Sequence, residues 1–172
     1  MRKCFALLFL LFSMCLFSEI ALFDIQIDDP NIEYQSVEYY VIAIPQLLEF
    51  ELADHAREYF KKAKEKYPDD VKILLLYGDI LYHEKDVKGE HEYYTELIKL
   101  FPNDYRVYLK RYYPDRELNK YKDCIQDLLR ANELCPLNID ILGKIGLFYL
   151  EIYNFDLAEK YLLEAYACDD KD

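Results

Sequence analysis

The sequence is short of basic residues and has no complete motif for catalysis. Its 172 residues include 21 Lys and Arg against 33 Asp and Glu, which gives a net charge of −12 at pH 7. Proteins that bind nucleic acid depend mainly on Lys and Arg to neutralise phosphates, so this balance argues against a nucleic-acid partner. An acidic domain that works outside the nucleus or nucleoid fits the composition better.

The motifs that would indicate an enzyme are incomplete. His83 is followed by glutamate, but not by the second histidine that a zinc-protease helix needs four residues after the first. Gly143 and Gly146 flank a lysine, yet the rest of a phosphate-binding loop is absent. His55, His83 and His91 fall at predicted surface or turn positions. We therefore predict no catalytic residue, no metal site and no cofactor, and a protein that is not an enzyme.

The cysteines also give little indication of a metal site, a redox site or a disulfide. The sequence has no C-x-x-C pair, and only Cys124, Cys135 and Cys168 follow the N-terminal segment. Cys124 stands where a small buried residue is expected, a role that a free cysteine fills well. Cys135 and Cys168 would lie at the ends of neighbouring helices, so a disulfide between them is conceivable, but we do not expect one.

Prolines mark a regular period in the chain. Pro68, Pro102 and Pro136 are 34 residues apart, and the next step reaches Asp170. Proline lacks the N–H that a continuing helix needs and disfavours helical geometry in the residue before it, so each mark predicts the end of a helix. A period of this length is typical of stacked helical hairpins.

The chain resembles the tetratricopeptide-repeat (TPR) family over four units, at residues 37–70, 71–104, 105–138 and 139–172. In each unit this family has large residues at positions 4, 7, 11 and 24, and small ones at 8, 20 and 27. The second and fourth units match best, through Leu74, Tyr77, Gly78, Leu81 and Tyr94, and through Leu142, Ile145, Gly146, Tyr149, Ala158, Leu162 and Ala165. The second unit departs from the pattern with Glu90 and Leu97 at small positions. The resemblance implies an all-α solenoid of four helix-turn-helix repeats.

The first and third units match mainly in their second helices, because their first helices contain proline. An interior proline costs about 3 kcal/mol in a straight helix. We therefore expect the first helix of unit one to begin near Pro45 or to kink just before it. In unit three, Pro114 predicts a break near Tyr113, with Asp115 capping a short restart.

Residues 1–18 have the pattern of a secretory signal peptide, with two cations followed by an apolar run that begins at Cys4. We favour cleavage after Cys15, which would release an exported chain. Residues 19–36 match no repeat position, and we predict a linker there. Lipid attachment at Cys15 is a second interpretation, in which this linker forms the tether. An uncleaved anchor of 20 residues from Cys4 is a third. Each interpretation predicts export, to the periplasm, the cell envelope or the medium, with a membrane contacted only through the N-terminus.

The TPR resemblance also implies a concave groove lined by the first helix of each unit. The candidate groove residues are Lys72, Leu76, Tyr82, Arg106, Lys110, Tyr113 and Lys144. Residues 105–138 form the one unit with more basic than acidic residues, seven against five. Arg106 and Lys110 lie on one face of the predicted helix, which predicts a positive spot that anchors an acidic group of an extended peptide.

We therefore expect a non-catalytic scaffold that binds a peptide or protein partner. Self-assembly into a homo-oligomer is the alternative, because the predicted helix 156–168 has no following hairpin in this sequence. Leu157, Tyr161 and Leu162 would then be left either beside charged neighbours in solvent or docked on another copy. An enzyme or a small-molecule binder is the least favoured interpretation.

Overall fold

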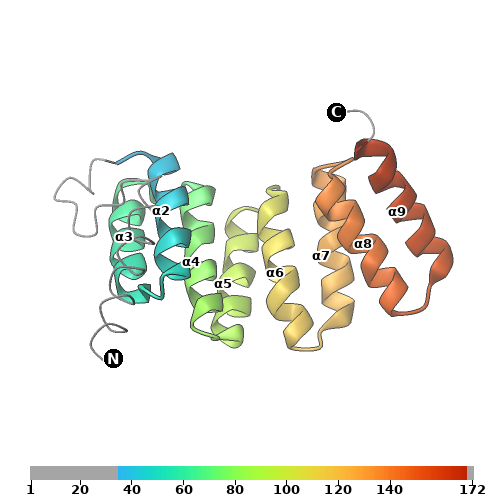
Figure 1. Ribbon diagram of the computed structural model, residues 1–172, viewed down its shortest axis with the longest axis horizontal. Coiled ribbons are helices and arrows are strands. Elements are labelled where there is room, and N and C mark those ends of the chain that lie inside the picture. The colour runs from blue at the N-terminus through green and yellow to red at the C-terminus, as the bar shows by residue number, and fades with distance from the viewer. Residues whose placement is uncertain (1–34, 170–172) are drawn as a thin grey trace, which may run out of the picture. The chain divides into compact units, whose positions relative to one another are not determined.

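The computed structural model describes residues 35–169, and within this range every regular element is an α-helix. The helices, labelled as in Figure 1, are α2 (Val37–Glu49), α3 (Ala53–Lys66), α4 (Val71–His83), α5 (Val87–Leu100), α6 (Tyr105–Glu117), α7 (Tyr121–Leu134), α8 (Ile139–Glu151) and α9 (Phe155–Asp169). They form four hairpins that follow one another in chain order (Figure 1). The prediction of four helix-turn-helix repeats is thus confirmed. The predicted signal peptide, Cys15 and most of the predicted linker lie outside the described residues.

Side-chain caps repeat with the same 34-residue spacing and fix where the first helices begin. The residue before each first helix accepts a hydrogen bond, through its side chain, from an N–H of the first turn. These residues are Ser36 before α2, Asp70 before α4, Asp104 before α6 and Asn138 before α8. Such a cap satisfies a backbone donor that the helix itself leaves unpaired, and typically contributes about 1 kcal/mol.

The turn inside each hairpin is also a repeated structure. One residue of each turn has a positive φ, between 58° and 61°, and these residues are 34 positions apart: Glu51, Lys85, Asn119 and Tyr153. In the second hairpin the Lys85 N–H donates to the Tyr82 carbonyl and the Asp86 N–H to the Leu81 carbonyl, which is the Schellman arrangement. The left-handed residue reverses the chain within three residues and sends it back antiparallel to the first helix.

Within the second and fourth hairpins, a glycine on the first helix faces a large side chain on the second. A Cβ atom on Gly78 would lie 2.0 Å from the hydroxyl oxygen of Tyr94, and one on Gly146 would lie 2.6 Å from Cγ of Leu162. Tyr94 and the neighbouring residues of the core, such as Leu74 and Val107, are almost completely buried. The small and large positions of the repeat therefore meet as the sequence pattern predicts.

The predicted helix start near Pro45 and the predicted break near Tyr113 are both wrong, whereas the alternative of a kink just before Pro45 stays a prediction. Pro45 lies inside α2, which begins eight residues earlier at Val37, and Pro114 lies inside α6, which continues to Glu117. Pro114 is buried, so packing of its ring contributes where the helix loses a hydrogen bond. The helix also needs to persist for only three residues beyond it. Packing of the hairpin outweighs the local preference in both helices.

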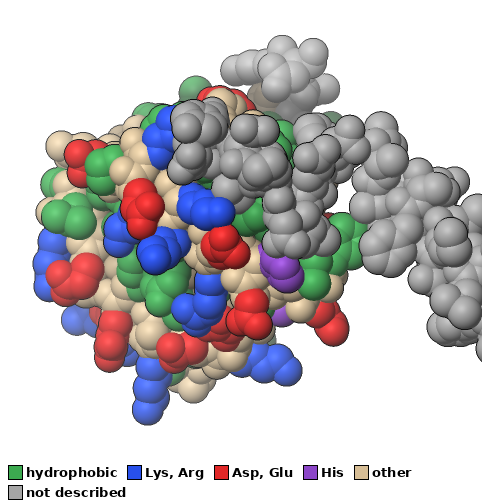
Figure 2. Space-filling model, turned by 90° about the vertical axis from the view of Figure 1, so that its left-hand side faces the viewer, with side chains coloured by type: hydrophobic (Ala, Val, Ile, Leu, Met, Phe, Trp, Pro, Cys, Tyr) green, Lys and Arg blue, Asp and Glu red, His purple; other side chains and the backbone are tan. Residues whose placement is uncertain are grey.

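The three cysteines within residues 35–169, Cys124, Cys135 and Cys168, are free thiols, so Cys135 and Cys168 do not form a disulfide. Cys124 is fully buried, as its small position predicts, and burial raises the pKa of its thiol to about 11. Charged side chains of both signs are mixed on the outside of the helical repeats. Figure 2 shows the face nearest α3, where lysine and arginine side chains lie among acidic ones.

Candidate binding groove

Each first helix carries a large apolar side chain that the fold leaves in solvent. We call this set the apolar row; its members are Ile42 on α2, Tyr82 on α4, Tyr113 on α6, and Leu147 and Leu150 on α8. Tyr82 is 61% exposed and Leu147 53%. Residues three or four apart share one face of a helix, so these positions face the same way as the predicted groove positions. Exposed apolar side chains in such a series are more typical of binding surfaces than of inert ones.

The basic residues predicted for the groove are already paired with acids. Lys110 Nζ donates to Asp79 Oδ1 across α4 and α6, and Lys144 Nζ donates to Asp140 within α8. Arg106 forms two side-chain hydrogen bonds to Asp104, and Lys72 Nζ lies 3.9 Å from Glu38 Oε1. The open positive spot predicted at Arg106 and Lys110 is therefore not present.

The remaining predicted groove residues divide into two groups. Leu76 is only 4% exposed and belongs to the core, so its prediction as a groove residue is wrong. Tyr113 is exposed, and the ammonium group of Lys144 lies 5.7 Å from the centre of its ring, which brings two predicted residues from α6 and α8 together. Cys15 lies outside the described residues and stays a prediction.

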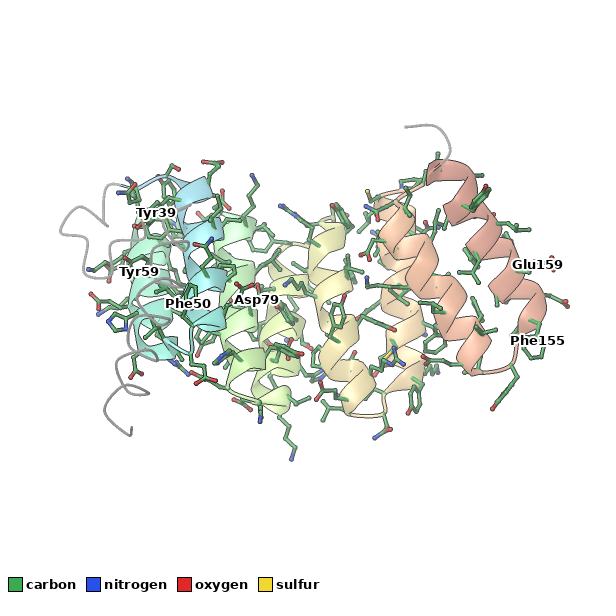
Figure 3. The ribbon with its side chains drawn as sticks, viewed as in Figure 1. Tyr39, Phe50, Tyr59, Asp79, Phe155 and Glu159 are labelled. Carbon is green, nitrogen blue, oxygen red and sulfur yellow. The ribbon has the colours of Figure 1, made fainter. Side chains whose placement is uncertain are left out.

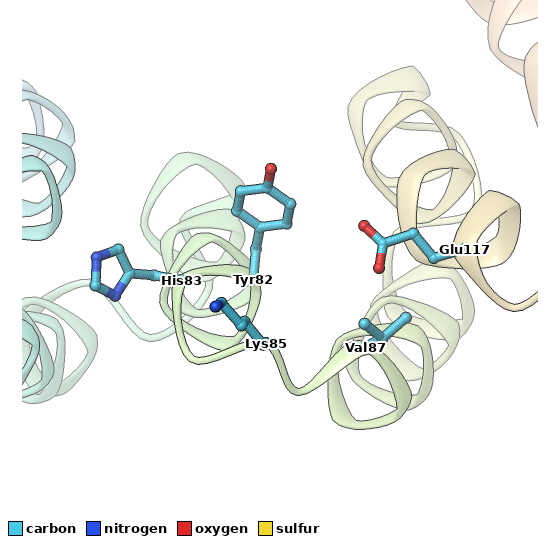
Figure 4. A pocket seen from close by; sticks show the side chains of 5 residues that line it. All are labelled: Tyr82, His83, Lys85, Val87 and Glu117. Carbon is cyan, nitrogen blue, oxygen red and sulfur yellow. The ribbon is translucent and has the colours of Figure 1, made fainter.

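A pocket of about 520 Å³ opens where α4 ends and α5 begins. It is lined by Tyr82, His83, Lys85, Val87 and Glu117. Figure 4 shows Tyr82 and Glu117 on its two sides, with Val87 between them at the start of α5. The pocket lies at one end of the first-helix face and includes Tyr82, a member of the apolar row.

Next to this pocket is a set of charged side chains that we call the acidic cluster. It consists of Glu117, which lines the pocket, and of Asp79, Glu90 and Lys110, which do not. Glu90 is 4% exposed, and no hydrogen bond or ion pair to its carboxyl group occurs among residues 35–169. Burial raises the pKa of Glu90 to about 7; Asp79 and Glu117 act in the same direction, and Lys110 opposes them. Figure 3 labels Asp79 on α4, in the second hairpin.

A second set of charged residues, the paired network, joins α5, α6 and α7 and consists of His91, Arg111, Asp115, Lys120 and Asp127. Arg111 donates to both carboxylate oxygens of Asp127, over 2.8 and 2.7 Å. His91 Nδ1 lies 2.5 Å from Oδ1 of the fully buried Asp115, in a close polar contact without hydrogen-bond alignment. Lys120 Nζ lies 2.6 Å from His91 Nε2.

The paired network corrects two sequence predictions. His91 is half-buried and not a solvated surface residue, and Asp115 does not cap a restarted helix. Sequence reasoning missed the network because its members come from two repeats. The acidic cluster had one signal in the sequence: Glu90 occupies a position where a small residue is usual.

Two features are absent from the described residues. Among them, no group of three or more His, Cys, Asp or Glu side chains is placed to hold a metal ion. Between residues 35 and 169 no helix has both the length and the apolar character to span a membrane. What the described residues do offer is a series of exposed apolar side chains, a pocket with one carboxylate in its wall, and paired charges.

Several solved structures share this fold. A crystal structure of MamA has a TM-score of 0.63 and 20% identity, covering 83% of this chain and 81% of that one. MamA from Desulfovibrio magneticus RS-1 has a TM-score of 0.63 and 15% identity, covering 80% of this chain and 77% of that one. MamA MSR-1 has a TM-score of 0.58 and 14% identity, covering 81% of this chain and 80% of that one. No family model matches the sequence, and no curated protein does. At these identities the likeness shows the fold, which is that of a TPR protein.

Proposed function

We propose that this protein is a non-catalytic scaffold that binds a protein or peptide partner along the first-helix face of its repeats. The observation that carries this proposal is the apolar row. Ile42, Tyr82, Tyr113, Leu147 and Leu150 come from four different helices and all remain in solvent. An extended segment that lay across the hairpins would bury them together, and aromatic and aliphatic anchors of this kind supply most of the energy of an interface.

Selection of binding peptides from a displayed random library, with the full chain as target, tests the proposal. Peptides that bind the native chain should lose about 1 kcal/mol or more of binding free energy per anchor in Tyr113→Ser and in Leu147→Ser. Leu100→Ser is the matched control, because Leu100 is 68% exposed but lies at the end of α5, away from the first helices. Equal affinity for all four proteins would refute binding at the apolar row.

Self-association through the last hairpin is a second candidate, favoured by a different surface. Tyr153, Phe155, Leu163 and Tyr166 are all more than half exposed in the α8–α9 turn and on α9. Figure 3 shows Phe155 and Glu159 at this end of the row of hairpins. The residues predicted to be uncovered are mostly not the exposed ones: Leu157 and Tyr161 are half-buried, and Tyr161 stacks on Tyr149 with 5.9 Å between ring centres.

Light scattering after size-exclusion chromatography separates these candidates. A dimer that becomes monomeric in Leu163→Ser with Tyr166→Ser supports self-association through α9. A native chain that stays monomeric at high concentration removes this candidate and leaves the peptide-binding scaffold.

Export to the periplasm, the cell envelope or the medium is part of the proposal and is supported by the pattern of residues 1–18. Mass spectrometry of the mature N-terminus distinguishes cleavage after Cys15, lipid on Cys15 and an intact anchor in a single experiment. An intact N-terminus on a chain that fractionates with soluble intracellular proteins would contradict export.

A further inference from the structure

The acidic cluster places a carboxyl group where a TPR-like hairpin usually has a small side chain. Glu90 lies one turn after Val87 on the same face of α5, and Val87 lines the pocket. Asp79 likewise lies one turn before Tyr82, another pocket residue, on α4. Because α4 and α5 run in opposite directions, Asp79 and Glu90 both lie about one helical turn from the pocket. Glu90 is buried there and does not itself line the pocket.

The charges at this place do not balance. Lys110 on α6 is the one cation among the groups that act on the Glu90 carboxyl, and its Nζ is already bound to Asp79. Glu117, also on α6, lines the pocket and has no ion pair within residues 35–169. Lys85 is the one lysine or arginine among the residues that line the pocket, and its side chain is exposed. Within residues 35–169, neither Glu90 nor Glu117 forms an ion pair with it or with any other cation.

A cation that fills this deficit has a definite chemistry. The described carboxylates are not grouped closely enough to surround a metal ion, so an elongated organic cation fits the spacing better. Tyr82 stands at the mouth with its ring 61% exposed, and an aromatic face attracts an ammonium or guanidinium group. The net charge of −12 also steers basic segments toward the chain in preference to acidic ones.

We propose that the pocket between α4, α5 and α6 binds a lysine or arginine side chain of the partner. Glu117 on the pocket wall holds its cationic group, the buried carboxyl of Glu90 one turn from Val87 attracts that group, and the aliphatic stem lies against Tyr82. The inference rests on the proposed scaffold function and names the chemistry that one part of the groove recognises. It replaces the acidic peptide group that the sequence predicts for Arg106 and Lys110.

Glu90 gives this site a dependence on pH. Its pKa of about 7 means that much of the carboxyl group is protonated near neutrality, and a bound cation favours the ionised form. Binding of a cation therefore strengthens as pH rises through about 7. The groups that face Glu90 are Asp79 from α4 and Lys110 and Glu117 from α6.

Titration of the ¹⁵N-labelled full chain with N-acetyl-arginine amide and N-acetyl-lysine amide, followed by NMR, tests the proposal. The amide signals of Tyr82, Val87 and Glu90 should shift, and the affinity should be higher at pH 8 than at pH 6. N-acetyl-norleucine amide is the control probe, because it has the stem of lysine without the charge. Equal shifts with norleucine would overturn the proposal.

Substitutions test which residues form the binding site. Glu90→Gln should lower the affinity for the cationic probes about tenfold and abolish the difference in affinity between pH 6 and pH 8. Glu117→Gln should lower the affinity but leave its pH dependence in place. Glu92→Gln, an exposed acid two residues farther along α5, should change nothing. Unaltered affinity in Glu90→Gln refutes the site.

Failure of this proposal is distinguishable from failure of the proposed function. If the cationic probes do not bind but library peptides still depend on Tyr113 and Leu147, only the cation site is wrong. If the peptides also ignore these two residues, the scaffold function itself fails.

Discussion

Glu90 and His91 are neighbours on α5, yet their surroundings are opposite. His91 joins the paired network, in which Asp115 and Asp127 lie against Arg111 and the imidazole of His91. Glu90 joins the acidic cluster, in which its charged neighbours are two acids and one lysine that is bound elsewhere. Removing one partner from a buried charged pair is strongly destabilising, whereas a buried acid without a partner is a cost that the folded protein carries. The unpartnered carboxyl of Glu90 is the observation on which its proposed role in binding rests.

The largest expected effect comes from breaking the paired network. Asp127→Ala removes two of the three hydrogen bonds of the half-buried Arg111 guanidinium and leaves the one to Thr95, so a loss of about 3 kcal/mol in the free energy of unfolding is expected. Denaturant unfolding measures it. Asp123→Ala, an exposed acid one turn earlier on α7, should leave stability almost unchanged. Similar small losses in both variants would show that the network does not hold the α6–α7 crossing.

The second largest loss of stability is expected from a substitution without charge at the α4–α5 crossing, where Gly78 faces Tyr94. Gly78→Ala places a methyl group 2.0 Å from the hydroxyl oxygen of Tyr94, which is fully buried and cannot move away freely. Overpacking of this kind costs about 1–3 kcal/mol. Gly143→Ala on α8 is the matched control: its Cβ would meet nothing within 4 Å, so helix propensity alone should stabilise the protein slightly. The comparison of crossings fails if both variants unfold at the same denaturant concentration as the native chain.

Glu90→Gln, a substitution in the acidic cluster, should increase stability instead of lowering it. The pKa of Glu90 is raised from 4.5 to about 7, so the unfolded chain gives up this proton at lower pH than the folded one. Folding stability attributable to Glu90 therefore falls as pH rises from about 4.5 to about 7 and is constant above that. Glu90→Gln should accordingly stabilise the protein by roughly 2 kcal/mol at pH 8 and have almost no effect at pH 4.

Unfolding curves of the native chain and Glu90→Gln, recorded from pH 4 to pH 8, measure this difference directly. Only the difference between the two proteins is interpreted, because paired carboxylates elsewhere change stability in the opposite direction. Destabilisation by Glu90→Gln at every pH would mean that the carboxyl has a structural partner.

The smallest effect is expected at Lys110. Its ion pair with Asp79 is about one third exposed on both sides, and such pairs contribute roughly 0–1 kcal/mol to stability. Lys110→Met should therefore barely change the free energy of unfolding. It removes the one cation that opposes the shift of Glu90, so the pKa of Glu90 should rise further, which an NMR titration would detect. A large loss of stability would place Lys110 in the same class as Arg111.

The sequence predicted the fold through features that repeat within one chain. Pro68, Pro102 and Pro136 mark the period, and Gly78 and Gly146 mark the crossings at which large side chains need room. The interior prolines misled the prediction, because local cost alone suggests a break. The gain from packing the whole hairpin is a property of tertiary contacts that no local pattern contains.

The groove was predicted less well than the fold. Helical spacing correctly placed Tyr82 and Tyr113 on exposed faces, but it could not show that Lys110 and Arg106 are neutralised. Lys110 finds its partner on a helix 31 residues earlier, and pairing at that distance depends on the geometry of the crossing. Glu90 was visible as a departure from the small residue usual at its position, and the structure gives that departure a chemical meaning.

An NMR titration of the side-chain carboxyl carbon of Glu90, alone and with N-acetyl-arginine amide, tests the central claim most directly. The uncompensated carboxyl should titrate with a midpoint of about 7 in the free protein. Because binding and ionisation are linked, the midpoint should move down when the cationic probe is bound. A midpoint near 4.5 that the probe does not change would contradict the claim, since Glu90 would then have neither a missing counter-charge nor a role in binding one.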